Sequence, residues 1–355
     1  MSINPLDHND LRARIESTLS EFVDARRPML DAISPDVSVL AVSLTQLISG
    51  GKRLRPAFAY WGYRATGGED SDALVRACAG LEFLQACALI HDDVMDSSDT
   101  RRGNPSTHKQ FQALHEHGQW RGDALKFGEG AAILIGDLAL SWADELLLTS
   151  GLAIDEVTRA KTVYDVMRTE LMAGQYLDLL EQVRGNTTVE RATNVIRFKS
   201  AKYTIERPLL LGAAIGDAPT ELNEALSSYG LALGEAFQLR DDVLGVFGDQ
   251  KTTGKPTGDD LREGKETVLV AYGRELGDDQ LRSLLTDHLG NPSITSDHIS
   301  DISARLVDCG ALAAVETRIE EMTARAVAAL ATPLIANDAR EALTELVRIA
   351  TQRAF

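Results

Sequence analysis

The sequence predicts an all-α fold on three observations. Apolar residues recur at helical spacing along almost the entire chain. We find no convincing set of segments that alternate apolar and polar residues, as half-buried strands do, and no clear signals for tight hairpins. No linker-like stretch divides the 355 residues. We therefore expect a single-domain bundle of long helices over residues 1–355.

One helix of functional interest is predicted from about Ser71 to about Met95. Ser71 follows Gly67 and Gly68, and serine is a favoured residue for capping the start of a helix. One face of this helix carries Leu81, Leu84, Gln85, Ala88, Asp92 and Asp96.

Three further helices are predicted for residues 155–182, 190–212 and 227–247. Pro208 should kink the second of these, because proline lacks the backbone donor that a helix interior uses. The polar, glycine-rich segment 248–266 is typical of a loop.

Composition and charge limit the classes of function. Hydrophobic residues make up 44% and charged residues 25% of the chain, which is ordinary for a globular protein with a substantial core. The net charge of −17 argues against nucleic acid or an anionic membrane surface as a main partner. The longest apolar runs, such as 131–136 and 209–215, are far shorter than the roughly 20 residues that span a bilayer. Three scattered cysteines suit a reducing compartment, so we expect a cytoplasmic protein without a transmembrane segment.

Two aspartate clusters carry most of the functional information. Asp92, Asp93 and Asp96 end one apolar segment, and Asp241 with Asp242 ends another. Like charges four residues apart destabilise a helix by roughly 0.2–0.5 kcal/mol, so a bound cation is a simple compensation. Magnesium prefers oxygen ligands and is usually held by a few carboxylates together with substrate phosphates. The clusters therefore predict a magnesium-bridged diphosphate site; two solvated acidic helix ends are the alternative.

Basic residues lie near both clusters. Arg101 and Arg102 come shortly after the first cluster, and arginine binds phosphate oxygens bidentately. The segment 50–56, Gly-Gly-Lys-Arg-Leu-Arg-Pro, combines glycines with three cations but lacks the spacing of a nucleotide-binding P-loop. Further cations are Lys199, Lys202, Lys255 and Lys265. Each alone is typical of a surface charge, but together they suffice for two diphosphates.

These residues, in this order, resemble the trans-isoprenyl diphosphate synthases, the polyprenyl synthetase family. The resemblance covers about residues 48–270. Its most specific segments are 50–56, 92–96 with 100–103, and 234–242 with 254–255. It implies an all-helical fold around a deep central cavity, usually in a homodimer, with C-terminal helices over about 275–355. It also implies condensation of isopentenyl diphosphate with an allylic diphosphate, with three magnesium ions when the allylic diphosphate is bound.

The resemblance also implies roles for individual residues. The implied metal ligands are Asp92, Asp96 and Asp241, supported by Asp93, Asp242 and Asp260. The implied contacts of the allylic diphosphate are Arg101, Lys199 and Lys255, with Lys265 completing the cage. Those of isopentenyl diphosphate are Lys52, Arg55, Gln85 and Arg102. The reacting region would be lined by Ser200, Tyr203, Phe237 and Gln238, and the catalytic set would be Asp92, Asp93, Asp96, Arg101, Lys199, Asp241, Asp242 and Lys255.

Three features depart from the family pattern. Gln85 stands where histidine is frequent, and glutamine keeps a hydrogen-bond donor. Gly245 stands where many members have a third aspartate in the second cluster, and we expect activity to persist. The segment 108–130 is longer than the usual connection, and its sequence indicates no role. Its histidines, His108, His115 and His117, indicate a transition-metal site only weakly.

Product length should be set on the helix that ends near Asp92. One helical turn, about 5.4 Å, is close to one isoprene unit. Short-chain members of the family place large aromatic side chains where this chain has Cys87 and Ala88. Deeper positions that could close the pocket are Leu81, Phe83 and Leu84. We therefore predict twenty-carbon geranylgeranyl diphosphate; shorter or longer products are the alternatives, as is ordinary helix packing by these side chains.

Three rival functions are open to such a chain. A terpene cyclase shares the first aspartate cluster but has no use for Lys52, Arg55 and Arg102, which serve a second diphosphate. A non-catalytic partner subunit of a related synthase would not need both clusters. A calcium-binding structural protein would need a loop of alternating Asp or Asn with a glycine and a terminal Glu, which is missing from the sequence.

Overall fold

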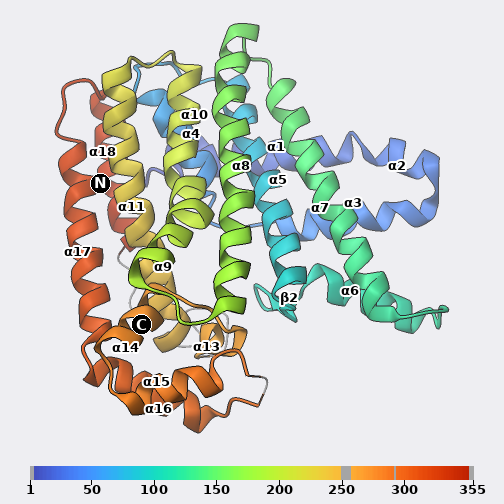
Figure 1. Ribbon diagram of the computed structural model, residues 1–355. Helices are drawn as coiled ribbons and strands as arrows, with labels where there is room; N and C mark the ends of the chain where they lie inside the picture. Colours follow the sequence, from blue (N-terminus) through green and yellow to red (C-terminus); the bar gives the residue numbers. More distant parts are fainter. Residues whose placement is uncertain (1–3, 249–256, 292, 352–355) are drawn as a thin grey trace. The chain divides into compact units, whose positions relative to one another are not determined.

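The computed structural model describes residues 4–248, 257–291 and 293–351. Almost all regular structure in these residues is helical, which confirms the all-α prediction (Figure 1). The chain divides into two compact units. Met1–Tyr60 and Gly68–Thr158 form the first, and Trp61–Gly67 and Arg159–Phe355 form the second. The expectation of one domain over the entire chain stays a prediction.

The first unit holds the N-terminal helices, a short hairpin and two long helices. Its elements are η1 (His8–Asp10), α1 (Leu11–Asp24), α2 (Arg27–Ile33), η2 (Pro35–Val37), α3 (Ser38–Ile48), α4 (Leu54–Arg64), α5 (Asp72–Met95), β1 (Thr100–Arg101), β2 (Asn104–Pro105), α6 (Thr107–His117) and α7 (Ala124–Leu148). The last turn of α4 belongs to the second unit.

Helix α5 has the predicted bounds. The Ser71 side chain accepts a hydrogen bond from the backbone N–H of Leu74 at 3.2 Å, which caps the helix start. Asp96 is the residue after the last turn, and Ser97 follows with a left-handed φ of +54°. The first aspartate cluster therefore lies where the helix ends.

Helix α5 packs mainly against α7 inside the first unit. Gly136 of α7 leaves room for the His91 ring, because a methyl group there would lie 2.1 Å from His91 Nε2. Deeper in the unit, the Phe83 ring packs at a tilt against Phe22 and edge-to-face against Trp142, at centroid distances of 5.3 and 5.8 Å. Burial of these aromatic rings stabilises the helix that carries the first cluster.

One short hairpin departs from the prediction. Strands β1 and β2 pair Thr100 with Pro105 and Arg101 with Asn104. The two turn residues, Arg102 and Gly103, have φ of +53° and +76°, as a type I′ turn requires. Arginine in the first turn position is not a usual hairpin signal, so the sequence did not indicate this turn.

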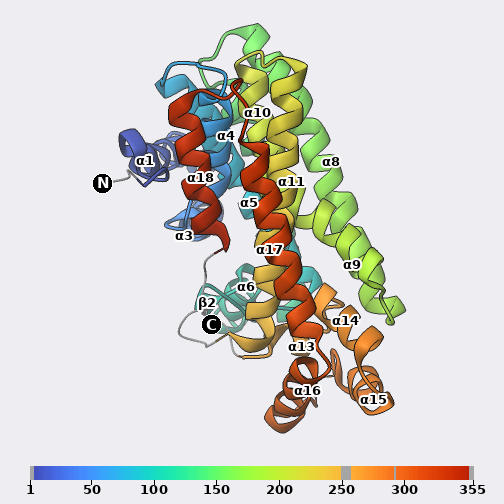
Figure 2. The ribbon, with the colours of Figure 1, turned by 90° about the vertical axis from the view of Figure 1, so that its left-hand side faces the viewer.

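The second unit holds the remaining helices, of which α8, α11 and α17 are the longest. Its elements are α8 (Ile154–Arg184, whose first turn belongs to the first unit), α9 (Val189–Val195), the π-helix η3 (Ile196–Glu206), α10 (Arg207–Ile215), α11 (Thr220–Phe247), α13 (Asp259–Glu263), α14 (Val268–Leu276), α15 (Asp279–His288), α16 (Ser296–Asp308), α17 (Ala311–Ala329) and α18 (Asn337–Thr351). Helices α11 and α17 run side by side, and α14 to α16 gather near one end of α17 (Figure 2).

Two predicted boundaries are wrong. Helix α11 begins at Thr220 rather than near residue 227, and the Ser227 hydroxyl donates to Glu206 at 2.8 Å. The kink near Pro208 stays a prediction; the π-helix η3 ends at Glu206, and Pro208 lies in the first turn of α10, where its missing donor costs little. The predicted loop 248–266 contains the short helix α13.

The wide π-helix is accommodated by glycines on both neighbouring helices. A methyl group at Gly174 of α8 would lie 2.4 Å from the Lys199 backbone nitrogen, and one at Gly234 of α11 would lie 2.6 Å from Ala201 Cα. π-helical segments are rare and often mark functional sites. Here the segment carries Lys199 and Ser200, two of the predicted site residues.

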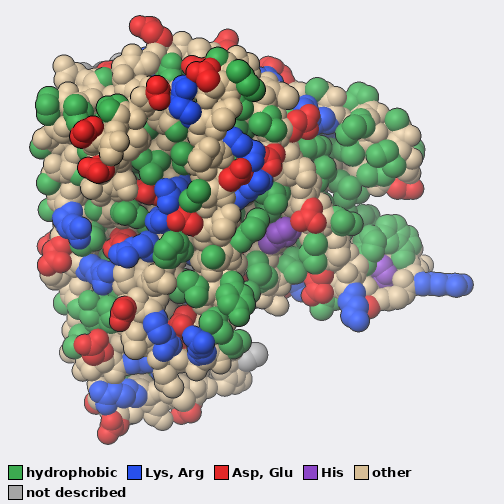
Figure 3. Space-filling model, turned by 45° about the horizontal axis from the view of Figure 1, so that its top comes forward, with side chains coloured by type: hydrophobic (Ala, Val, Ile, Leu, Met, Phe, Trp, Pro, Cys, Tyr) green, Lys and Arg blue, Asp and Glu red, His purple; other side chains and the backbone are tan. Residues whose placement is uncertain are grey.

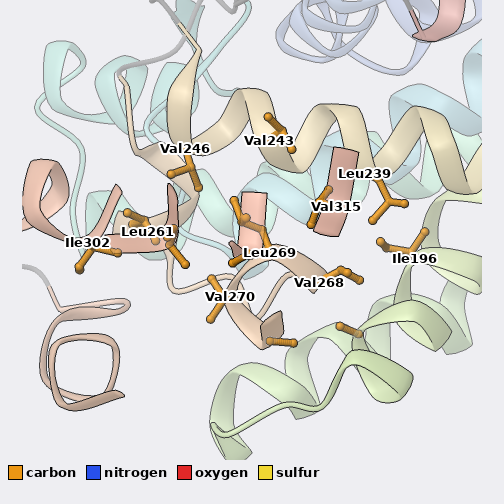
Figure 4. Packing of buried hydrophobic residues seen from close by; sticks show 14 of the residues in the cluster. Ile196, Leu239, Val243, Val246, Leu261, Val268, Leu269, Val270, Ile302 and Val315 are labelled. Carbon is orange, nitrogen blue, oxygen red and sulfur yellow. The ribbon is translucent and has the colours of Figure 1, made fainter. Parts of the chain in front are cut away.

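Helix α11 is held by an apolar face. Leu239, Val243 and Val246 point into a buried cluster that Leu269 and Val315 also enter (Figure 4). Their spacing of three and four residues places them on one side of the helix. This packing fixes the orientation of Asp241 and Asp242, which lie between Leu239 and Val243 in the sequence.

Helix α5 is the one helix in the described residues that is long and apolar enough to cross a membrane, with a mean hydropathy of 1.6. Within the structure 72% of that segment is buried, as in the core helix of a globular protein. Acidic and basic side chains are interspersed over the face shown in Figure 3.

Replacing Gly234 with alanine should destabilise the protein. The added methyl group overlaps the π-helix backbone, and overpacking of this kind costs about 1–3 kcal/mol. Gly130→Ala is the matched control, because nothing lies within 4 Å of a methyl group there and alanine favours the helix. Urea unfolding of both variants measures the difference, and equal stability would contradict the packing account.

Candidate active site

The predicted site residues fall in both units. The first unit carries Lys52, Arg55, Leu81, Leu84, Gln85, Cys87, Ala88, Asp92, Asp93, Asp96, Arg101 and Arg102. The second carries Lys199, Ser200, Tyr203, Phe237, Gln238, Asp241, Asp242, Asp260 and Lys265. Lys255 lies outside the described residues.

In the first unit, the hairpin returns Arg101 to the aspartate cluster. Arg101 Nε donates to Asp93 Oδ1 at 2.9 Å, and its Nη2 donates to the same oxygen. The same guanidinium lies 3.6 Å from Asp92 Oδ2. Arg101 was expected to contact an allylic diphosphate; here it pairs with two carboxylates of the first cluster.

Asp93 is buried, unlike its neighbour Asp92, whose side chain keeps 18% of its surface exposed. Burial raises the pKa of Asp93, and the hydrogen bonds and charge of Arg101 oppose that rise. Asp93 thus acts as an internal partner of Arg101, while Asp92 is more accessible.

Arg102 points away from the cluster that Arg101 contacts. Its Nη1 donates to the Leu47 carbonyl at the end of α3 at 3.1 Å. A methyl group at Gly51 would lie 3.5 Å from Arg102 Nη2. The turn therefore sends two adjacent arginines to two places, one to the aspartates and one to the basic loop 49–53.

In the second unit, a chain of hydrogen bonds joins the π-helix to α11. The Ser200 hydroxyl donates to Gln238 Oε1 at 2.5 Å, and Gln238 Nε2 donates to Asp242 Oδ1 at 2.8 Å. Tyr203 and Phe237 are buried in the same unit. The structure thus brings together three of the predicted residues through direct contacts.

Asp242 is buried in an acidic environment. Burial raises its pKa to about 8, and the charges of Asp260 and Asp241 add to the rise. Gln238 and Lys265 oppose it. Lys265 Nζ lies 2.6 Å from Glu263 and 3.7 Å from Asp260.

The structure explains the glycine at position 245. A methyl group there would lie 2.0 Å from Asp260 Oδ2, so the Asp260 carboxylate fills the space of a side chain at 245. Asp260 comes from α13, fifteen positions further along the chain. A third carboxylate thus stands beside Asp241 and Asp242, although the sequence has glycine where many family members have aspartate.

Lys199 has a partner that the sequence analysis missed. Its Nζ donates to Asp178 Oδ2 of α8 at 2.7 Å. Asp178 follows Gly174 by four residues, so both lie on the same face of α8 beside the π-helix. Gly174 itself was the available signal in the sequence, because a glycine within a helix can mark a close approach of another segment.

The residues expected to limit product length are mostly core residues of the first unit. Leu81, Leu84 and Cys87 are buried, and Ala88 is partly buried. Cys87 Sγ lies 3.7 Å from His91 Nδ1, on the side of α5 that packs against α7. Phe83 belongs to the aromatic cluster with Phe22 and Trp142.

The long segment 108–130 forms α6, a turn and the start of α7. The His115 ring packs against Trp120 and Phe127 at centroid distances of 5.9 and 5.4 Å. His115 Nε2 lies 3.2 Å from the Arg121 carbonyl, and His117 Nδ1 lies 2.7 Å from that of Ala113. These histidines make contacts within the segment.

Both acidic clusters offer carboxylate oxygens, the type of ligand atom that a hard divalent cation prefers. Asp241, Asp242 and Asp260 bring carboxylates together at one end of α11, and a cation would offset the burial and the mutual repulsion that raise the pKa of Asp242. Within the described residues, no preformed group of three His, Cys, Asp or Glu side chains has the geometry of a metal site.

The raised pKa of Asp242 predicts a pH-dependent stability. An unfolded aspartate has a pKa near 3.9. Between that value and about 8, the folded chain keeps a proton that the unfolded chain has lost, so the free energy of unfolding falls as pH rises. In metal-free buffer, the Tm of Asp242→Asn relative to the wild type should rise between pH 5 and pH 8. The same difference at both pH values would contradict the assignment.

Comparisons with known proteins agree with the residues above. The polyprenyl synthetase family model matches residues 37–306. The chain is 32% identical to a geranylfarnesyl diphosphate synthase of Aeropyrum pernix over 91% of this chain and 96% of that protein. It is 30% identical to an octaprenyl diphosphate synthase of Escherichia coli over 95% and 97%.

Among solved structures, one similar chain is a geranylgeranyl pyrophosphate synthase from Corynebacterium glutamicum, in complex with isoprenyl diphosphate and magnesium. It is 38% identical, with a TM-score of 0.93 over the full length of both chains. The chain therefore belongs to the polyprenyl synthetase family of trans-prenyltransferases.

Proposed function

We propose that this protein condenses isopentenyl diphosphate with the allylic dimethylallyl, geranyl and farnesyl diphosphates, head to tail, and that its main product is geranylgeranyl diphosphate. The observation that carries this proposal is that each unit holds a set of aspartates beside a cation of its own. Asp92 and Asp93 lie with Arg101, and Asp242 and Asp260 lie with Lys265. Similar relatives named for twenty-five- and forty-carbon products make longer chains the alternative.

The aspartates are proposed to hold magnesium, in three ions once the allylic diphosphate is bound. Asp92, Asp96 and Asp241 would be the ligands. When bound, the metal would neutralise negative charge on the departing diphosphate. Asp93 would keep Arg101 in place beside that group, and Asp260 would occupy the side of α11 that Gly245 leaves open.

The cations divide between the two diphosphates in this proposal. The allylic diphosphate would be held by Arg101, Lys199, Lys255 and Lys265, and isopentenyl diphosphate by Lys52, Arg55, Gln85 and Arg102. Lys199 would donate a hydrogen bond to a phosphate oxygen, either in place of its contact with Asp178 or in addition to it. The hydrogen-bonded chain of Ser200, Gln238 and Asp242 would fix the side chains that line the reacting region.

The reaction needs no side chain tuned as a general base. Breaking the bond between the allylic carbon and diphosphate oxygen leaves a cation, and the double bond of isopentenyl diphosphate attacks it. The new carbon–carbon bond forms, and a proton leaves the adjacent carbon for the released diphosphate. Fixed cations at the leaving group supply the electrostatic stabilisation, and the apolar side chains of Tyr203 and Phe237 help to exclude water.

A cytoplasmic homodimer is the proposed working form. On α7, Leu134 is 64% and Ile133 46% exposed in the single chain. Large apolar side chains exposed at consecutive helix positions support an interaction surface there. Burial of this face against a second copy would remove them from water.

The proposal is tested by incubating the purified chain with labelled isopentenyl diphosphate, magnesium and one allylic diphosphate of five, ten or fifteen carbons. We expect a twenty-carbon product with each primer and none with excess chelator. A longer ladder of products would keep the reaction and reject the chain length. Absence of any product would reject the function and favour a non-catalytic subunit.

Enlarging Ala88 should shorten the product. Ala88 is only partly buried, and a phenylalanine there would obstruct a chain growing along α5 about one turn below Asp92. We expect Ala88→Phe to move the main product to fifteen carbons or fewer, while Ala88→Ser keeps the wild-type length. Cys87→Phe should have the same direction but a greater cost in stability, because Cys87 packs beside His91. Unchanged length in both phenylalanine variants would contradict this placement of the floor.

A further inference from the structure

The loop between α3 and α4 is held by a buried arginine, Arg53, which the sequence suggested only as one of three cations in segment 50–56. Arg53 is 4% exposed and has a left-handed φ of +55°. Its Nη2 donates to the Ile48 carbonyl at 2.6 Å, and its own carbonyl accepts the first helical hydrogen bond of α4 from Ala57. Lys52 precedes Arg53 directly, and Arg55 follows in the first turn of α4. The conformation of Arg53 therefore determines how both neighbouring cations leave the loop.

The partner of Arg53 is an acid on the central helix of the same unit. Arg53 Nη1 donates to Glu82 Oε2 at 2.5 Å, and Glu82 is 8% exposed. A second carboxylate, Glu16 of α1, lies at 3.7 Å, and its side chain is 46% exposed. A buried ion pair is a strong tether, because removing one partner leaves an uncompensated charge in a medium of low polarity.

The charge of Glu82 also favours the protonated form of a second arginine beside the loop, Arg102. Partial desolvation lowers the pKa of Arg102, and among the neighbouring charges Glu82 opposes that shift most. The guanidinium groups of Arg53, Arg101 and Arg55 add to it. One buried carboxylate therefore stands among four guanidinium groups that repel one another.

Glu82 shares its helix with the first aspartate cluster. Ten residues separate it from Asp92, which at the helical rise is about 15 Å. The basic loop is thus tied through Arg53 to the rigid element that ends in the aspartates. A change in the tether would shift the loop relative to the cluster without altering α5 itself.

We propose that Glu82, through Arg53, is a positioning residue for the isopentenyl diphosphate end of the reaction. This inference rests on the proposed function. Glu82 is not expected to touch substrate, because its oxygen is engaged by Arg53 and a carboxylate repels diphosphate. Its role is to hold the loop so that Lys52, Arg55 and Arg102 converge on one diphosphate. The length of α5 between Glu82 and Asp92 then sets how far that diphosphate lies from the aspartates where the helix ends.

The test is Glu82→Gln, which keeps the size of the side chain and removes its charge. We expect the KM for isopentenyl diphosphate to rise about tenfold or more, as expected for loss of one charged hydrogen bond. The KM for the allylic diphosphate and the magnesium requirement should stay within about twofold, since the aspartates are untouched. Glu16→Gln is the matched control, because it removes an acid near the same arginine that is solvent-exposed, and it should leave both KM values unchanged.

A second variant guards against a folding defect. Arg53→Gln combined with Glu82→Gln removes both charges of the pair, and it should fold as well as the wild type while keeping the high KM for isopentenyl diphosphate. Equal losses for both substrates, or a lower kcat with an unchanged KM for isopentenyl diphosphate, would overturn the inference. Inactivity of the wild-type chain would reject the proposed function instead, so the two failures are distinguishable.

Discussion

Compensation of buried charge is the constraint on which the functional parts of this structure depend. Asp93 and Glu82 in the first unit, and Asp242 in the second, are each almost fully removed from water. A buried carboxylate is stable only when hydrogen bonds or opposite charges offset its desolvation. Arg101 and Arg53 do this in the first unit, whereas in the second, among the residues that the structure describes, Asp242 is offset by a neutral amide, Gln238, and by the more distant Lys265. The second cluster is therefore the one with the stronger need for an added cation.

One long helix in each unit places these charges. Helices α5 and α11 each bury an apolar face and end in aspartates, so the positions of the charges follow from packing far from the chemistry. The π-helix adds a local widening that glycines on α8 and α11 accommodate. Each unit thus carries its acids and cations on a rigid element, as a site that must stabilise developing charge requires.

The sequence predicted the helices with clear local signals and missed features created by tertiary contacts. The bounds of α5 followed from Ser71 as a cap and from the apolar period. The start of α11 was misplaced because Ser227 has the chemistry of a cap but donates instead to Glu206. The π-helix has no local signature, since glycines on two other helices permit it.

The sequence motifs predicted which residues belong to the site, but not which residues those side chains contact. The aspartates and cations could be named from their spacing. Three contacts join segments that are far apart in sequence. Asp260 fills the space beside Gly245, Asp178 accepts a hydrogen bond from Lys199, and Glu82 pairs with Arg53. The lone acid in the apolar stretch before Gln85 was the one sequence signal for the last of these.

The most direct test of this account is calorimetric binding of an unreactive allylic thiolodiphosphate, with and without magnesium, to the wild-type chain and to Asp92→Asn and Asp241→Asn. The account predicts binding that requires magnesium and is weakened at least about tenfold in each variant, while isopentenyl diphosphate still binds without the metal. Magnesium-independent binding of the analogue, unaffected by either substitution, would contradict the assignment of the aspartates to the metal.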